Sequence, residues 1–157
     1  FSGLNLAEMQ RFSTSLVRCL PGHVVIGLVG TLGAGKTTLV QAMARALEID
    51  ATEVTSPTFT LLQSHRGTIT LHHLDAYRVA DEDEFLELGV EELFDDEASW
   101  TVVEWADRFP RAMPDETIWL EIRIDSQPDR RSLMLTTRDA GLRPALDRLV
   151  DEFAKSH

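Results

Sequence analysis

The sequence has very little cysteine and no long apolar run. Cys19 is the only cysteine among its 157 residues, which excludes an internal disulfide and a cysteine-based zinc site. No stretch of about 18 apolar residues is present, so we expect no membrane-spanning helix, and the N-terminus lacks the apolar core of a secretion signal. These absences predict a cytoplasmic protein that works without a membrane.

Positive charge is also scarce, because 15 Lys and Arg residues face 26 Asp and Glu residues and the formal net charge is −11. Ten of the acids lie in residues 81–97, which contain no Lys, Arg or His, so the rest of the chain is nearly neutral with 16 acids and 15 bases. Such a protein is not expected to hold bare nucleic acid through phosphate contacts. Any RNA in its pathway would be held by a partner protein. The acidic run is either a solvated face or a partner surface.

The strongest pattern lies in residues 30–37, which read Gly-Thr-Leu-Gly-Ala-Gly-Lys-Thr and are followed by Thr38. This sequence fits the G-x-x-x-x-G-K-[ST] pattern of a phosphate-binding loop. Its glycines let backbone N–H groups approach a polyphosphate, Lys36 brings a positive charge to the outer phosphates, and the Thr37 hydroxyl is an expected Mg²⁺ ligand. A strand-like run precedes the loop and a helix-like stretch follows it, as the motif requires. The sequence therefore predicts a nucleotide site.

The segments around this loop predict an α/β fold. Two pairs of strand-like segments are joined by connections too short for a crossover, which indicates antiparallel hairpins on a sheet whose other strands are parallel. We therefore expect one domain over residues 1–157, a P-loop NTPase-like three-layer sandwich with a mixed parallel/antiparallel sheet. Strands are expected at 24–29, 59–64, 68–74, 100–104, 117–124 and 131–137, and helices at 5–20, 38–47, 83–94 in two pieces divided by Gly89, and 142–154.

Two carboxylates follow strand-like segments, where ligands bind in sheets of this kind. Asp75 closes one strand and Glu104 closes another. Either side chain could bind Mg²⁺ or orient a hydrolytic water, and their pattern leaves open whether they compete for one role or share it. Trp105, beside Glu104, is either a core cap or a lid over the site.

Other polar residues leave alternatives open. Residues 54–60, with hydroxyls around Pro57, form either a switch-like loop near the γ-phosphate or the approach to a strand. His72 and His73 point to opposite faces of their strand, and we expect them to be packed or surface residues rather than metal ligands. Arg130 and Arg131 lie at a hairpin turn, where a cation could reach a nucleotide or remain in solvent.

Five short blocks occur in order along the chain. They are residues 30–38, the Thr-Ser-Pro-Thr-Phe of 55–59, the His-Leu-Asp-Ala-Tyr-Arg of 73–78, the Leu-Gly of 88–89 and the Val-Glu-Trp of 103–105. With these blocks the chain resembles the TsaE (YjeE) family of bacterial tRNA-modification ATPases over nearly its whole length. The first block alone is shared by many NTPases, whereas the blocks together are far more specific.

The resemblance implies a small P-loop protein that binds ATP and Mg²⁺ and hydrolyses ATP weakly when alone. It implies action with TsaB and TsaD in forming the threonylcarbamoyl group on adenosine 37 of tRNAs that read codons beginning with A, and in resetting that complex. The tRNA would be met only through the complex, and the chain alone would be a monomer or weak oligomer.

The resemblance also implies roles for individual residues. Glu104 would bind Mg²⁺ together with the loop threonine, Asp75 would support hydrolysis together with the loop lysine, Arg130 would lie near the nucleotide, and Leu6 would approach the base through its backbone. The phosphates would be held by Gly33, Ala34, Gly35, Lys36, Thr37 and Thr38, of which Thr37 is the metal ligand and Lys36 the catalytic cation.

Two other classes of protein compete with this interpretation. A small P-loop kinase would need an acceptor pocket and usually a basic lid, and the lid region here, residues 81–97, is acidic. A nucleotide-switched assembly factor would use the same loop without required hydrolysis. A GTPase is less favoured, because the sequence contains no Asn-Lys-x-Asp segment for guanine.

Overall fold

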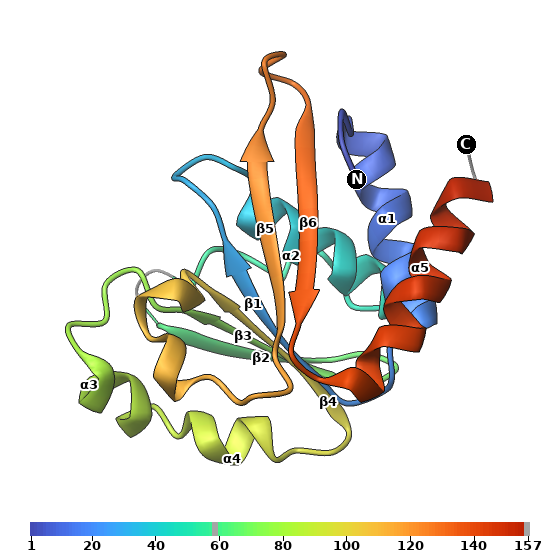
Figure 1. Cartoon of the computed structure of the whole chain (residues 1–157). Coiled ribbons are helices and arrows are strands. Elements are labelled where there is room, and N and C mark those ends of the chain that lie inside the picture. Colours follow the sequence, from blue (N-terminus) through green and yellow to red (C-terminus); the bar gives the residue numbers. More distant parts are fainter. Residues whose placement is uncertain (58–59, 156–157) are drawn as a thin grey trace.

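One six-stranded sheet organises the computed structural model, which describes residues 1–57 and 60–155 (Figure 1). The strand order is β2-β3-β4-β1-β5-β6. The β3–β4, β4–β1 and β1–β5 pairs are parallel, whereas β2–β3 and β5–β6 are antiparallel, so the predicted mixed α/β sheet is confirmed. The strands are β1 (Val24–Val29), β2 (Leu62–Arg66), β3 (Thr70–Asp75), β4 (Ser99–Glu104), β5 (Ile118–Ile124) and β6 (Arg131–Thr137).

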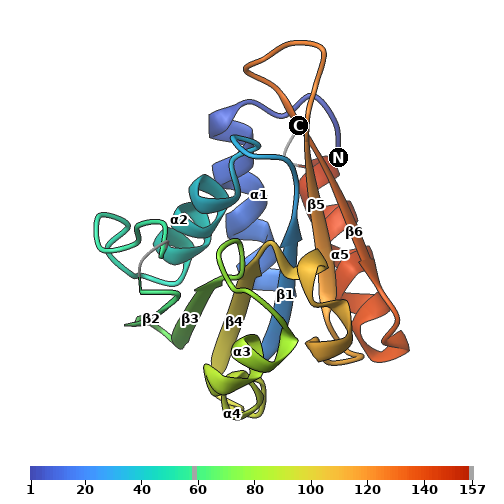
Figure 2. The same ribbon diagram turned by 90° about the vertical axis from the view of Figure 1, so that its left-hand side faces the viewer.

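Helices cover both faces of this sheet, as the two views show (Figures 1 and 2). One face packs against α1 (Leu6–Cys19), α2 (Lys36–Ala46) and α5 (Arg143–Lys155) in the larger apolar core. The other face packs against α3 (Glu82–Glu87), α4 (Val90–Phe94) and two short 3₁₀ turns in a second core. These two turns are η1 (Ala106–Arg108) and η2 (Pro110–Ala112), and a third 3₁₀ turn, η3 (Ala140–Leu142), precedes α5.

Local sequence explains where the principal elements begin and end. Asn5 and Glu8 form a capping box at the start of α1, because each side chain accepts a hydrogen bond from the backbone N–H of the other. Gly89, at φ 77°, divides α3 from α4 as predicted. Nearly every residue of β1 is buried, as expected for a central strand that is covered on both faces. No helix in the described part of the chain is long and apolar enough to cross a bilayer.

The first hairpin differs in detail from the prediction. Residues 65 and 66 belong to β2 rather than to the turn, which lies at 67–69. Gly67 explains the shift, because a Cβ there would collide with the backbone oxygen of Leu47, which accepts a hydrogen bond from Thr68 N at 2.9 Å. Residues 58 and 59, in the predicted strand 59–64 and the switch-like loop, lie outside the described residues.

Strand register brings the polar ends of the central strands together. Glu104 is the register partner of Leu28 in β1 on one side and of Asp75 in β3 on the other. β1 continues directly into the glycine-rich loop, and the loop leads into α2. The glycine loop and both predicted carboxylates therefore lie at one edge of the sheet, the carboxyl edge where ligands bind in α/β folds.

Candidate active site

The glycine-rich loop between β1 and α2 has a backbone that only glycine suits. A Cβ on Gly30 would lie 2.7 Å from the backbone oxygen of Ile122, and Gly35 has a left-handed φ of 107° immediately before α2. Because Gly35 is the N-cap, no side chain at that position covers the first N–H groups of the helix. These N–H groups and the positive end of the helix dipole can therefore hold an anion.

Lys36, the first residue of α2, lies folded back over the loop with only 5% of its surface exposed. Its Nζ donates hydrogen bonds to the backbone oxygens of Gly30 at 2.7 Å and Thr31 at 3.0 Å, and lies 3.9 Å from the ring centroid of Trp105. Burial lowers the pKa of Lys36, while the nearby carboxylates Glu104 and Asp75 oppose this shift. The ammonium group is therefore positioned beside the loop, between an aromatic face and acidic groups.

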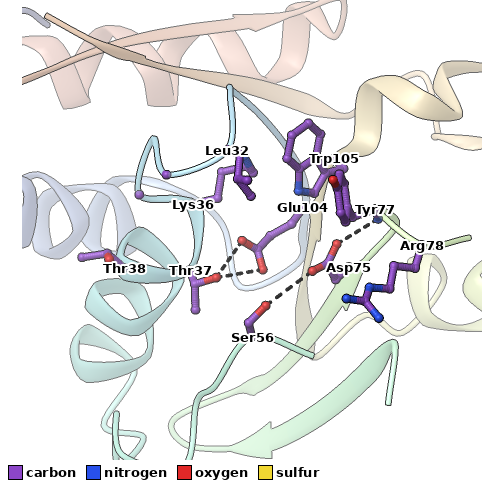
Figure 3. A pocket seen from close by; sticks show the side chains of 12 residues that line it. Leu32, Lys36, Thr37, Thr38, Ser56, Asp75, Tyr77, Arg78, Glu104 and Trp105 are labelled. Atoms are coloured by element: carbon purple, nitrogen blue, oxygen red, sulfur yellow. Dashed lines mark hydrogen bonds between the residues drawn. The ribbon is translucent and has the colours of Figure 1, made fainter. Parts of the chain in front are cut away.

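A hydrogen bond between Thr37 and Glu104 joins the start of α2 to the end of β4 (Figure 3). The Thr37 hydroxyl donates to Glu104 Oε1 at 2.9 Å and lies 3.3 Å from Oε2, and Glu104 is only 3% exposed. No group of three or more His, Cys, Asp or Glu side chains suited to a metal was found among residues 1–57 and 60–155.

Asp75 lies at the end of β3, beside Glu104 in the register of the sheet. Its Oδ1 accepts a hydrogen bond from the backbone N–H of Tyr77 at 2.9 Å, and its Oδ2 lies 3.5 Å from the Ser56 hydroxyl. Burial raises the pKa of Asp75 and the charge of Glu104 adds to the shift, whereas the Tyr77 N–H opposes it. A carboxyl group whose pKa is raised in this way can exchange a proton more readily near neutral pH.

These groups face a cavity of about 520 Å³ (Figure 3). It brings together most of the residues predicted from the sequence, namely five from the loop and the start of α2 and both carboxylates. Ser56 and Trp105 also line it, and the alternatives given for residues 54–60 and for Trp105 both remain predictions. The lining residues are Leu32, Gly33, Gly35, Lys36, Thr37, Thr38, Ser56, Asp75, Tyr77, Arg78, Glu104 and Trp105.

Three predicted residues lie outside this cavity. Leu6, 59% exposed, and Ala34, which is fully buried, line a smaller cavity of about 270 Å³ that also includes Gly35, Thr38 and Arg131. Arg130 Nη1 instead donates to the Gly3 backbone oxygen at 2.9 Å and lies 3.1 Å from Glu8 Oε2. The neighbouring Arg131 reaches the loop, because its Nε donates to the Ala34 backbone oxygen at 2.7 Å.

Sequence reasoning missed the contact made by His73. The expectation that His73 is a packed residue agrees with its complete burial, but its Nε2 lies 2.8 Å from Glu104 Oε2. The signal was the His-x-Asp spacing, which puts His73 on the same face of β3 as Asp75. His72, on the opposite face, contacts Ser64 and Asp96 instead.

Comparisons with known proteins identify the family of this chain. The family described as threonylcarbamoyl adenosine biosynthesis protein TsaE matches residues 4–133. The tRNA threonylcarbamoyladenosine biosynthesis protein TsaE of Treponema pallidum is 37% identical over 123 residues, which cover 78% of this chain and 90% of that protein. The TsaE of Bacillus subtilis is 38% identical over 111 residues, which cover 70% of this chain and 67% of that protein.

A solved structure extends the likeness to the fold. The crystal structure of Bacillus subtilis YdiB superposes with a TM-score of 0.78 at 24% identity, and covers 97% of this chain and 93% of that chain. At this level of identity the likeness concerns the fold alone. The family match and the curated relatives carry the assignment further: the chain belongs to the TsaE family, which takes part in the biosynthesis of threonylcarbamoyladenosine in tRNA.

Proposed function

We propose that residues 1–157 act as a single P-loop ATPase domain, which binds ATP with Mg²⁺ in the 520 Å³ cavity and hydrolyses the nucleotide. The observation that carries this proposal is the contact of 2.9 Å between the Thr37 hydroxyl and the Glu104 carboxylate, at the start of the helix that follows the glycine loop. A hydroxyl at this position of the loop and an acidic residue at a strand end are the Mg²⁺ ligands of P-loop NTPases.

The residues at this contact suit Mg²⁺. This ion prefers oxygen ligands, keeps several waters, and binds through one or two carboxylates together with substrate phosphates, so it needs no cluster of three protein side chains. Thr37 and Glu104 would supply two oxygen ligands from two elements of the fold. When bound, the ion would neutralise negative charge that develops on the phosphate oxygens.

The remaining side chains divide the work of binding and hydrolysis. The N–H groups of residues 33–38 hold the phosphates, and Lys36 exchanges the backbone oxygens of Gly30 and Thr31 for an outer phosphate oxygen. Asp75 orients the attacking water and takes up its proton, a role that suits a carboxyl group with a raised pKa. Leu6 lines the smaller cavity beside the loop, and Arg130 contacts Gly3 at the start of the chain; the base and ribose would extend towards these residues.

In the pathway, this ATPase acts in the cytoplasm with homologues of TsaB and TsaD in forming the threonylcarbamoyl group on adenosine 37 of tRNAs that read codons beginning with A. Hydrolysis resets that complex after each round. The net charge of −11 supports an indirect role towards RNA, because it opposes binding of the RNA phosphate backbone by this chain alone. The exposed acids of residues 81–97 are a surface on which a partner protein could dock.

The decisive experiment measures the ATPase rate of the purified chain with and without the TsaB–TsaD pair. We expect a low rate alone and a higher rate with the pair, and we expect Lys36→Ala to remove both nucleotide binding and modification of tRNA. Unchanged modification with Lys36→Ala would contradict the proposal. If Glu104→Gln abolishes hydrolysis while modification continues at a normal rate, the chain is instead a switch that needs no hydrolysis, and phosphorylation of a small molecule would indicate a kinase.

A further inference from the structure

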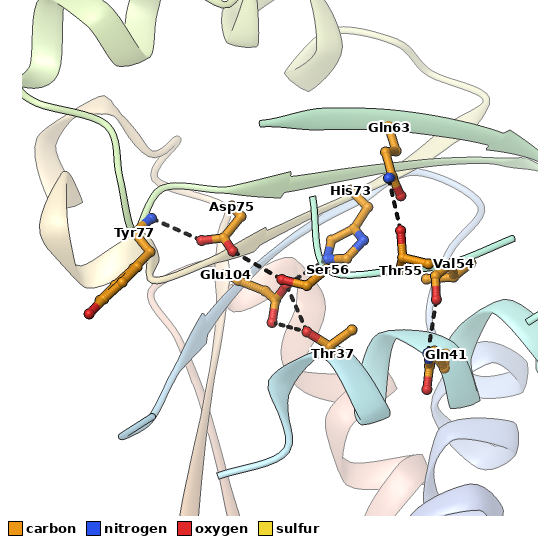
Figure 4. Close-up of polar contacts among 10 residues, drawn as sticks. All are labelled: Thr37, Gln41, Val54, Thr55, Ser56, Gln63, His73, Asp75, Tyr77 and Glu104. Atoms are coloured by element: carbon orange, nitrogen blue, oxygen red, sulfur yellow. Dashed lines mark hydrogen bonds and ion pairs between the residues drawn. The ribbon is translucent and has the colours of Figure 1, made fainter. Parts of the chain in front are cut away.

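The imidazole of His73 is fully buried next to Glu104 (Figure 4). Its Nε2 lies 2.8 Å from Glu104 Oε2. The imidazole Nε2–H is the donor that a carboxylate oxygen at this distance accepts, and in that tautomer of a neutral imidazole Nδ1 is an acceptor. Within residues 1–57 and 60–155, Nδ1 is buried and has no hydrogen-bond partner. The imidazole therefore has one polar contact in the described part of the chain, and that contact is with Glu104.

This arrangement does not follow from the needs of folding. A buried acceptor without a partner destabilises a protein, and an apolar side chain could fill the same space without that cost. An unpartnered buried polar atom therefore requires an explanation. The contact with Glu104 provides one, because it restrains a carboxylate to which we assign a role in metal binding.

Two hydrogen bonds hold the Glu104 carboxylate from different sides. Thr37 Oγ1 approaches Oε1 at 2.9 Å from α2, and His73 Nε2 approaches Oε2 at 2.8 Å from β3. Together they restrain the orientation of the carboxylate, with the shorter threonine contact at Oε1 and the histidine contact at Oε2. His73 does not line the cavity, so it can act only through Glu104.

We propose that His73 is a positioning residue that fixes the orientation of the Glu104 carboxylate for Mg²⁺. This inference rests on the proposed function, because it takes Glu104 as the metal ligand. Residues that orient a ligand side chain commonly change metal affinity by about 10–100-fold when they are replaced. His73 therefore sets how tightly Mg²⁺ is held and leaves the affinity of the loop for phosphate unchanged.

Two substitutions of His73 distinguish the effect of the hydrogen bond from Nε2 from the effect of losing the imidazole ring. Gln at position 73 carries an amide nitrogen near the place of Nε2 and can still donate to Glu104, whereas the shorter Asn carries it near the place of Nδ1 and cannot. We would measure the affinity for a non-hydrolysable ATP analogue by calorimetry, without Mg²⁺ and over a series of Mg²⁺ concentrations. In His73→Asn we expect the Mg²⁺ concentration for half-maximal tightening to rise about 10–100-fold, with unchanged affinity in the absence of Mg²⁺. His73→Gln should recover most of this loss.

The neighbouring His72→Gln is the matched control, because its ring contacts Ser64 and Asp96 on the opposite face and should leave the Mg²⁺ dependence unchanged. The ATPase rate of His73→Asn should approach the wild-type rate at saturating Mg²⁺, which a folding defect would not allow. Equal losses in the Asn and Gln variants, or a loss already present without Mg²⁺, would overturn the inference. Wild-type binding that does not respond to Mg²⁺ would overturn both this inference and the metal site of the proposed function.

Discussion

An antiparallel hairpin lies at each edge of the sheet, β2–β3 on one side and β5–β6 on the other, and the inner strand of each pairs in parallel with a central strand. The inner strand β3 buries polar side chains, including His73 and Asp75. The inner strand β5 buries apolar ones, including Ile118 and Ile122. Two hairpins of the same topology are therefore used for different purposes.

Their lengths relative to the central strands explain the difference. β3 ends level with β4, so that Asp75 and Glu104 stand side by side at the cavity. β5 and β6 run on past the end of β1, and Figure 1 shows their turn projecting beyond the other strands. There, the backbone of Ile122 lies against Gly30, and Arg131 bonds the loop at Ala34. In the proposed function the first hairpin supplies a reactive carboxylate, whereas the second hairpin contacts the glycine-rich loop proposed to bind phosphate.

The strongest way to test this division is to remove the carboxylate of the first hairpin to which we assign the proton transfer. We expect Asp75→Asn to lower kcat of the partner-stimulated ATPase by about 10²–10⁴-fold, because an amide cannot take up the proton of the attacking water. The KM for ATP should change little. The matched control is Glu121→Gln on β5, whose carboxylate pairs with Arg123 at 2.7 Å. A similar fall in kcat for the control would break the proposed division.

In the second hairpin the largest effect should be on stability. Ile122 is 1% exposed and belongs to the larger core, so Ile122→Ala should lower the free energy of unfolding by about 2–5 kcal/mol. Urea denaturation measures this change. The kcat of the remaining folded protein should stay near the wild-type value, and a loss of kcat comparable to that of Asp75→Asn would show that this hairpin also takes part in the chemistry.

The two adjacent arginines of the second hairpin sharpen its assigned role. Arg131→Gln removes a charged hydrogen bond to the Ala34 backbone oxygen, and such a bond contributes about 1.5–3 kcal/mol to the free energy of unfolding. We expect ATP affinity to fall as well, because the loop loses a contact that holds its backbone in place. Arg130→Gln should have a smaller effect, because Arg130 contacts Gly3 and Glu8 rather than the loop. Calorimetric titration with ATP measures the affinity of both variants. A larger loss of ATP affinity for Arg130→Gln would contradict this expectation and support the position near the nucleotide that the family resemblance implies for Arg130.

The pH dependence of hydrolysis offers a milder test of the first hairpin. Burial raises the pKa of Asp75, so its active, ionised form should be lost at a higher pH than for an ordinary aspartate, whose pKa is about 3.9. We therefore expect kcat to fall as pH is lowered, with a midpoint above that value. A pH–rate profile measures the midpoint. The residual activity of Asp75→Asn should not show this fall in kcat at low pH. If the variant still shows it, the fall is due to the titration of another group.

The smallest effect is expected on the outer face of the first hairpin. Ser64→Ala removes a hydrogen bond of 2.8 Å to His72 Nδ1, at an exposed position away from the cavity. We expect a loss of about 0.5–1.5 kcal/mol in the free energy of unfolding and no change in ATPase rate. Thermal denaturation measures the change in stability, and an ATPase assay measures the rate. A clear fall in rate would mean that the two faces of β3 are coupled.

Much of the site could be predicted because its signals are local in sequence. Glycine spacing with the lysine and threonine that follow it identified the loop, and apolar runs that end in Asp75 and Glu104 placed both carboxylates at strand ends. Short connections predicted both hairpins. The first hairpin was placed less accurately: β2 begins at Leu62 rather than within 59–61, and the turn lies at 67–69 because Gly67 is fixed by a contact with Leu47 that lies far away in the sequence.

By itself, the sequence determined the loop, the order of the main strands and helices and the mixed α/β class, since each depends on residue types at short, regular spacing. Only the tertiary structure decided that Asp75 stands beside Glu104, that His73 rather than His72 contacts that carboxylate, and that Arg131 rather than Arg130 reaches the loop. These choices depend on the register between strands, and a shift of one residue would turn every side chain of a strand to the opposite face.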